Sequence, residues 1–104
     1  MENRISQIKK MIETDPDDSF LCYALALEQE KEGKYKDAIK TIEDLMKKDP
    51  DYLGAYYKLG KLYEATSKYG KAEETYKKGI ELAIQKQDNK TRGELEEALW
   101  LIEE

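Results

Sequence analysis

The apolar residues near the start of the chain recur at helical spacing. Ile5, Ile8 and Ile12 are three and four residues apart, which places them on one face of a helix expected over about residues 2–13. Pro16 ends this helix, because the residue before a proline is pushed out of the helical region. The first segment is therefore predicted to be a short amphipathic helix.

Two more helices are predicted before residue 49. The second begins after a cap at Asp17, Asp18 or Ser19 and runs to about residue 32, where Gly33 ends it in a left-handed conformation. Its expected buried residues are Leu21, Cys22, Leu25, Ala26 and Gln29. The third helix ends near Lys48, and the apolar pattern that makes it consists of Tyr35, Ala38, Ile39, Ile42, Leu45 and Met46.

The second half of the chain repeats this alternation of helix and turn. The fourth helix is predicted to carry Tyr56, Leu59, Gly60, Leu62 and Tyr63, and it ends at a turn over residues 66–68. The fifth carries Tyr69, Ala72, Tyr76, Gly79, Ile80 and Ala83. After the polar stretch 85–91, a last helix over about 91–103 places Leu95, Ala98, Leu99 and Ile102 on one face. The pattern predicts an all-α protein of about six helices.

The chain contains an internal repeat. The tripeptide at 15–17, Asp-Pro-Asp, recurs at 49–51, which is 34 residues later. The same offset relates Tyr23 to Tyr57, Leu25 to Leu59, Lys34 to Lys68, Tyr35 to Tyr69 and Ala38 to Ala72.

These residues identify a family resemblance. The tetratricopeptide pattern is W-x2-L-G-x2-Y, then A-x3-F and a closing Pro, in units of 34 residues. Residues 53–84 resemble it through Tyr56, Leu59, Gly60, Tyr63, Ala72, Tyr76 and Gly79, and residues 19–50 through Cys22, Leu25, Ala26, Ala38, Ile42, Leu45 and Pro50. Gln29 departs from the pattern where a Tyr is expected, and Ile84 departs where a Pro is expected.

The resemblance implies a right-handed α-α superhelix, a solenoid of antiparallel helix pairs, of the small bacterial type. We expect one domain over 1–104, with a leading half-repeat helix at 1–16, repeat one at 17–50, repeat two at 51–84 and a C-terminal capping helix at 85–104. Because Ile84 replaces the closing proline, the fifth helix is expected to run past the usual stop.

Composition narrows the class of function. The net charge of −5 argues against nucleic-acid binding, which needs a basic face. The longest apolar run, residues 20–27, is far shorter than the ~20 residues of a membrane span, and the first ten residues hold no apolar signal-peptide core. One cysteine excludes an internal disulfide and fits a reducing compartment. We therefore expect a cytoplasmic protein that binds neither nucleic acid nor membrane.

The sequence offers little catalytic chemistry. There is no histidine, which removes the commonest general base and metal ligand and excludes Ser-His-Asp and Cys-His arrangements. Cys22 occupies a core place of the repeat and is interpreted as a packed thiol. We expect no enzymatic activity, no cofactor and no metal.

The resemblance implies that the first helix of each unit lines a concave groove that holds a peptide or helix of another protein. The residues at those places are Phe20, Tyr23, Leu27 and Glu30 in the first unit, and Gly54, Tyr57, Lys58, Lys61 and Glu64 in the second. Tyr23 and Tyr57 hold the same place in both units. They are interpreted either as anchors for a partner or as side chains packed between successive helices.

Chaperone termini are not the partner that this resemblance favours. The chaperone-binding members grip a terminal carboxylate with a clamp of Lys and Asn, whereas Ala24, Leu27 and Lys58 stand here where that clamp has Asn.

Self-association through the terminal helices is the alternative function, and it would give a weak homodimer. Trp100 lies about 140° around the last helix from Leu95, away from the apolar face. It either packs across the end of the fifth helix or contacts another chain.

Overall fold

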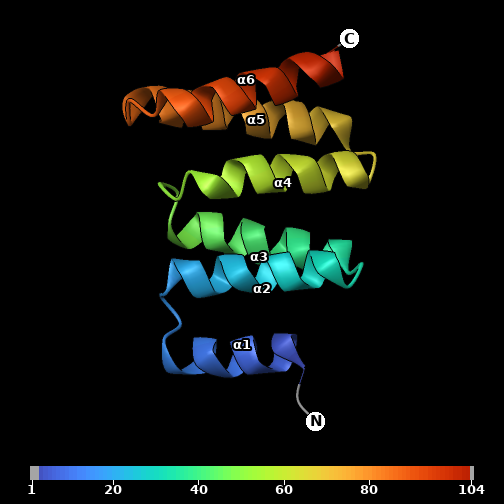
Figure 1. The fold of residues 1–104 in the computed structure, drawn as a ribbon, viewed down its shortest axis with the longest axis vertical. Coiled ribbons are helices and arrows are strands. Elements are labelled where there is room, and N and C mark those ends of the chain that lie inside the picture. The colour runs from blue at the N-terminus through green and yellow to red at the C-terminus, as the bar shows by residue number, and fades with distance from the viewer. Residues whose placement is uncertain (1–2, 104) are drawn as a thin grey trace. The chain divides into compact units, whose positions relative to one another are not determined.

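The computed structural model describes residues 3–103, and this range contains six α-helices and no strand. The helices are α1 (Arg4–Thr14), α2 (Ser19–Lys31), α3 (Tyr35–Lys48), α4 (Gly54–Ala65), α5 (Tyr69–Gln85) and α6 (Asn89–Glu103), as Figure 1 shows. The chain divides into an N-terminal unit, Met1–Pro50, and a C-terminal unit, Asp51–Glu104. The prediction of an all-α fold is confirmed, and the division falls inside the second Asp-Pro-Asp motif of the repeat.

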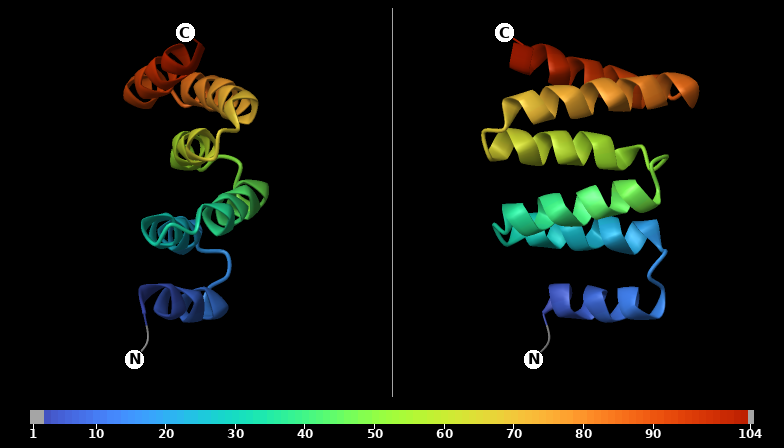
Figure 2. Two further views of the ribbon diagram at one scale, coloured as in Figure 1. Left: turned by 90° about the vertical axis from the view of Figure 1, so that its right-hand side faces the viewer. Right: turned by 180° about the vertical axis from the view of Figure 1, so that it is seen from behind.

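The N-terminal unit packs α1 against α2 and α2 against α3, with consecutive helices antiparallel (Figure 2). Ile5, Ile8 and Leu25 form a buried cluster, against which Ile12 and Ala24 pack from the two helices. The N-cap of α1 is Asn3, whose side chain accepts a hydrogen bond from the backbone N–H of Ser6. The predicted start of this helix at residue 2 lies outside the described residues.

A polar pair takes the place of an aromatic residue between α2 and α3. Gln29 stands where the repeat pattern has a Tyr, and it is buried as predicted. The Thr41 hydroxyl donates a hydrogen bond of 2.7 Å to Gln29 Oε1, so the buried amide oxygen has a partner. In the C-terminal unit the same two places hold Tyr63 and Thr75; Thr75 donates to the backbone carbonyl of Lys71, as Thr41 also donates to that of Asp37.

The C-terminal unit packs α4 against α5 and α5 against α6 (Figure 2). Every residue expected to be buried on α4 is buried, and Tyr76 of α5 is the largest fully buried side chain of the described protein. The Tyr76 ring lies directly against Gly60. A methyl group added at Gly60 would therefore overlap this ring. Gly60 therefore allows α4 to lie next to a large side chain of α5.

Some apolar positions of the helical pattern are not buried. Tyr35 and Tyr69, which hold the same place in the repeat, are exposed. Each is the first residue of its helix. Others are half-buried; these are Leu21, Met46, Ile80, Leu99 and Ile102.

The same turn follows α2, α4 and α5. Gly33, Ser67 and Gln87 each take a left-handed conformation, with φ of 77°, 61° and 57°. In each turn the next residue's N–H reaches a carbonyl five residues back, as in Lys34 N to Gln29 O at 2.8 Å and Lys68 N to Tyr63 O at 2.8 Å. Asp88 N makes the equivalent bond to Ala83 O at 2.9 Å. This is the Schellman arrangement, which satisfies the last carbonyls of a helix.

The boundary between α5 and α6 differs from the prediction in one respect. α5 continues to Gln85, past residue 84, as the missing proline predicted. α6, however, begins at Asn89 and not near residue 91, because Asp88 caps it. The Asp88 carboxylate accepts bonds from the backbone N–H of Thr91 at 3.0 Å and from the Thr91 hydroxyl at 2.8 Å.

Candidate partner-binding faces

One face of α2 carries large apolar side chains that the N-terminal unit leaves uncovered. Phe20, Tyr23 and Leu27 are three and four residues apart and share one side of the helix. Phe20 is 67% exposed and Leu27 is 38% exposed, whereas Tyr23 is half-buried. The α2 face, defined by these three residues, is therefore apolar and accessible at two of its three positions.

The corresponding face of α4 is charged, and its side chains contact one another. Lys61 Nζ lies 5.5 Å from the centre of the Tyr57 ring and 3.8 Å from Glu64 Oε2. The Tyr57 ring is in turn 6.3 Å from the Tyr76 ring, centre to centre, with a tilt of 46°. Lys58 is half-buried beside this group. We define the α4 face by Tyr57, Lys58, Lys61 and Glu64, and within it Lys61 contacts both Tyr57 and Glu64.

A hydrogen bond joins the core of the C-terminal unit to the α4 face. The Tyr76 hydroxyl donates to Glu64 Oε2, so the buried ring on α5 ends at an accessible carboxylate on α4. Burial raises the pKa of Tyr76, and the hydrogen bond to Glu64 raises it further. The sequence pattern places Tyr76 on the fifth helix and Glu64 on the expected binding side of the fourth, and it does not connect them. Gly60 is the feature of the sequence that could have indicated this contact. A glycine inside a helix suggests that a neighbouring element comes close to the backbone there.

The two faces hold the same places in the repeat but differ in chemistry. Phe20 corresponds to Gly54, Ala24 to Lys58, and Leu27 to Lys61. The tyrosines, Tyr23 and Tyr57, are common to both, and Glu64 corresponds to Glu30, which follows the α2 face on the same helix. The α2 face can therefore contact an apolar group, and the α4 face can contact an anionic one.

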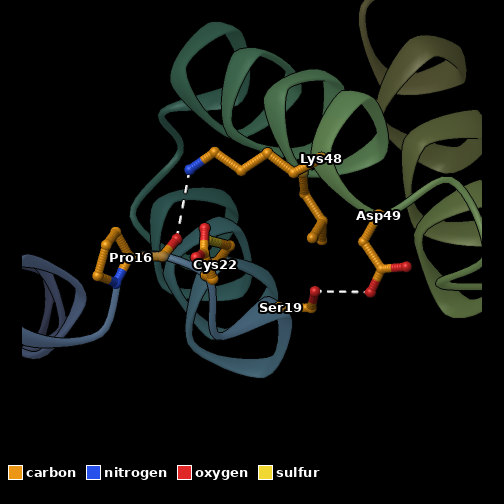
Figure 3. Close-up of a pocket in the computed structure, with 7 residues that line it drawn as sticks. Pro16, Ser19, Cys22, Lys48 and Asp49 are labelled. Carbon is orange, nitrogen blue, oxygen red and sulfur yellow. Dashed lines mark hydrogen bonds between the residues drawn. The ribbon is translucent and has the colours of Figure 1, made fainter.

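A cavity of about 200 Å³ lies in the N-terminal unit beside the only cysteine (Figure 3). Lys48 Nζ donates to the Pro16 carbonyl at 3.3 Å, and the Ser19 hydroxyl donates to Asp49 Oδ2 at 2.7 Å across its wall. Cys22 is buried next to these groups, and burial raises the pKa of its thiol while Lys48 acts in the opposite sense. A raised pKa keeps the sulfur as a protonated thiol, which is a poor nucleophile.

Two further features bear on the class of protein. Among residues 3–103, no group of three or more Cys, His, Asp or Glu side chains is placed to hold a metal ion. In the same range, no helix has the length and apolar character needed to cross a membrane.

The comparisons with known proteins identify the family. A family model described as a tetratricopeptide repeat matches residues 30–85. A tetratricopeptide repeat domain protein from Salinibacter ruber, solved as a crystal structure, is 42% identical and superposes with a TM-score of 0.78. The alignment covers 83% of this chain and 96% of that one. The chain belongs to the tetratricopeptide repeat family.

Two other solved structures extend the comparison. The solution structure of the Salinibacter ruber domain is 43% identical, with a TM-score of 0.82 over 86% of this chain and 90% of that one. The TPR2B domain of yeast Sti1, solved as a complex with pHsp70, has a TM-score of 0.88 over 95% of this chain and 79% of that one. At 19% identity this second likeness concerns the fold alone. No curated protein matches the chain.

Proposed function

We propose that this chain is a non-catalytic interaction module that binds a peptide or helix of another protein through the α2 face and the α4 face. The observation that carries the proposal is the exposure of Phe20 and Leu27 on the same side of α2. Large apolar side chains that a domain leaves in water on one helix face are typical of a contact surface.

The chemistry of the two faces indicates which groups the partner should carry. The α2 face favours an apolar side chain, and Lys58 and Lys61 on the α4 face favour a carboxylate. The complex of the yeast Sti1 domain with pHsp70 supports a binding role, because the same fold holds a partner there. The residues proposed for binding are Phe20, Tyr23, Leu27, Tyr57, Lys58, Lys61 and Glu64. We place this module in the cytoplasm, where the single thiol of Cys22 stays reduced.

Affinity capture with three variants tests the proposal. Phe20→Ala with Leu27→Ala removes the apolar side chains of the α2 face, and Lys58→Ala with Lys61→Ala removes the positive charges of the α4 face. Tyr69→Ala is the matched control, because it removes an exposed aromatic side chain that belongs to neither face. Circular dichroism establishes that all three fold like the wild type.

The expected result is a protein that the wild type and Tyr69→Ala retain and that both face variants lose. Titration of the purified partner against each variant should then show affinity reduced at least tenfold for the α2-face variant, which corresponds to about 1.4 kcal/mol. If all variants retain the same proteins, or if the wild type retains none, the two faces are not the binding surface.

A further inference from the structure

The cavity beside Cys22 lies where the other repeat carries a large aromatic side chain. Cys22 corresponds to Tyr56 through the 34-residue offset, and both residues are buried in their units. A thiol is smaller than a phenol ring, and a cavity of about 200 Å³ is present beside it (Figure 3). A cavity of about 150 Å³ is large enough to hold a benzene ring. The N-terminal unit therefore has room for a ring that its own chain does not supply.

The surroundings of Tyr56 in the C-terminal unit indicate what such a ring contacts. The Tyr56 Cβ lies so close to Gly79 that a carbon added to this glycine would be 2.8 Å away. Burial raises the pKa of the Tyr56 hydroxyl, and the nearby carboxylate of Asp51 raises it further. The counterparts of Gly79 and Asp51 are Leu45 and Asp17, and both line the cavity. Leu45 is larger than Gly79, and the cavity is the space that remains beside it.

The polar groups around the cavity favour a neutral hydrogen-bond donor. Asp17 and Asp49 each contribute a carboxylate, and Lys48 contributes an ammonium group. Lys48 donates to the Pro16 carbonyl, and Asp49 accepts from the Ser19 hydroxyl, so both are engaged within the wall (Figure 3). Asp17 is exposed, and its carboxylate can accept a hydrogen bond from a hydroxyl group. An anionic ligand would be repelled by both aspartates.

We propose that the cavity beside Cys22 binds a phenol, whose ring packs against Cys22 and Leu45 and whose hydroxyl donates to Asp17. Tyr56 supports this assignment, because the C-terminal unit holds a phenol ring of its own at the corresponding place. The cavity uses no residue of the α2 face or the α4 face, so this site is separate from the proposed binding surface. The ring can belong to a small free phenol or to a tyrosine of a partner, since both carry the same group.

Titration of p-cresol, followed through the backbone amide signals in NMR spectra, tests the site. p-Cresol is the side chain of tyrosine as a free molecule, and its binding should saturate with a dissociation constant of about 1 mM. Signals of residues 17–22 and 45–49 should shift, whereas those of 51–56 and 79–83, where Tyr56 fills the place, should not. Shifts that do not saturate, or that lie elsewhere in the chain, overturn the proposal.

Toluene is the control ligand, because it has the ring and lacks the hydroxyl. The wild type should bind p-cresol about tenfold more tightly than toluene, as expected for a hydrogen bond to a charged group. Asp17→Ala should lose this preference. Asp51→Ala removes the corresponding carboxylate of the other unit and should keep it. Equal binding of the two ligands by the wild type, or an unchanged preference in Asp17→Ala, contradicts recognition of the hydroxyl by Asp17.

Competition with N-acetyl-tyrosinamide distinguishes the two sources of the phenol. If it displaces p-cresol with similar affinity, the site admits a tyrosine of a polypeptide. If p-cresol binds and is not displaced, the ligand is a small free phenol. Both results support a phenol site and identify the molecule that carries the ring.

A variant that fills the cavity provides the last test. Cys22→Tyr places the ring of the other repeat at this position and should lose p-cresol binding, whereas Cys22→Ser, of similar size to the wild type, should keep it. Circular dichroism establishes that both variants fold. If Cys22→Tyr folds and still binds p-cresol at the same residues, the cavity is not the site. If it does not fold, the residues whose signals shift in the wild type decide the question.

Discussion

Gly60, Tyr76 and Glu64 depend on one another. The Tyr76 ring lies where a side chain at residue 60 would be, and its hydroxyl reaches the carboxylate of Glu64. The buried ring therefore contributes twice, by filling the space between α4 and α5 and by fixing a residue of the α4 face. The two contributions can be separated by substitution.

Tyr76→Phe keeps the ring and removes only the hydroxyl, so it should cost about 1.5–3 kcal/mol, the value of a hydrogen bond to a charged group. Tyr76→Ala also empties the core and should cost about 3–5 kcal/mol. Chemical denaturation measures both. Tyr69→Phe, at an exposed position, is the control and should leave the stability unchanged.

The raised pKa of Tyr76 also predicts a dependence on alkaline pH. The folded protein holds the phenol protonated above its usual pKa of 10.0, whereas the unfolded chain releases the proton there. The stabilisation is thus complete below about pH 10 and is lost as the pH rises toward the folded pKa. Above about pH 10, wild type should lose stability faster than Tyr76→Phe. If wild type and Tyr76→Phe lose stability equally as the pH rises, ionisation of Tyr76 is not the cause.

The close approach at Gly60 predicts strong coupling between two substitutions. Gly60→Ala should destabilise the protein by about 1–3 kcal/mol, because the added methyl group overlaps the Tyr76 ring. Combining it with Tyr76→Ile reproduces Ala26 and Ile42, which hold the same places in the N-terminal unit and are fully buried. The double variant should therefore lose less stability than the two single losses together. Strict additivity would show that the overlap is relieved in another way.

At the scale of the elements, the three Schellman turns set the direction of the chain after α2, α4 and α5. Gly33 adopts its φ of 77° without steric cost, whereas Ser67 and Gln87 adopt similar angles with a side chain present. The C-terminal unit therefore contains strained residues at both of its Schellman turns.

Ser67→Gly should remove one of these strains and raise stability by up to about 1 kcal/mol, less the extra chain entropy of glycine when unfolded. Such a gain moves the thermal midpoint by up to about 4–8 °C in a domain of this size. Gly33→Ala is the matched reverse change and should lower the midpoint, since nothing lies within 4 Å of the added carbon and only the backbone is affected. If Ser67→Gly and Gly33→Ala shift the thermal midpoint in the same direction, backbone strain at these turns does not explain the change in stability.

The cap of α6 predicts a response to acid. The hydrogen bonds from Thr91 lower the pKa of Asp88 below its usual value of 3.8. Its stabilisation is present above that value and is lost as the pH falls through the folded pKa. Asp88→Asn keeps a capping acceptor that does not titrate. The stability advantage of wild type over Asp88→Asn, measured by thermal unfolding, should therefore shrink as the pH falls below the usual Asp88 pKa of 3.8.

The sequence was sufficient to predict the number and type of the elements, because the 34-residue repeat and the helical spacing agree at almost every position. Interactions between side chains on different elements were not predictable. Thr41 bonding to Gln29 and Tyr76 bonding to Glu64 both join residues twelve positions apart across a turn, and such bonds depend on rotamers that no spacing specifies. The exposure of Tyr35 and Tyr69 was missed for a similar reason, since apolar character does not reveal where a helix contact ends.

At the scale of the whole molecule, two units share one plan but divide their chemistry. The N-terminal unit contributes the apolar α2 face, and the C-terminal unit contributes the charged α4 face. The units also differ in their cores, because Leu62, Tyr76 and Leu95, three of the largest fully buried side chains, belong to the C-terminal unit. In that unit α5 packs against a helix before it and a helix after it.

The difference between the cores predicts unequal autonomy. A peptide of residues 51–104 should be more helical by circular dichroism than a peptide of residues 1–50, although both are small enough to be only marginally stable. An equimolar mixture of the two peptides is the control. If the mixture is more helical than the sum of the separate peptides, one unit needs the other to fold. If the 1–50 peptide is the more helical, the buried side chains of the C-terminal unit do not give it the more stable core.

The pairing of Gly60 with Tyr76 also restricts how the two repeats could have diverged. If both units descend from one duplicated ancestor, the route between an Ala–Ile pair and a Gly–Tyr pair passes through one of two intermediates. The Ala–Tyr intermediate places a methyl group inside the ring, whereas the Gly–Ile intermediate leaves only unfilled space. The order of substitution without overlap is therefore fixed in either direction. Going toward the Gly–Tyr pair, the glycine must appear before the tyrosine; going away from it, the tyrosine must be replaced before the glycine. A consensus averaged over such repeats could combine the two forbidden residues, so anyone building longer arrays from this unit would have to copy both positions together.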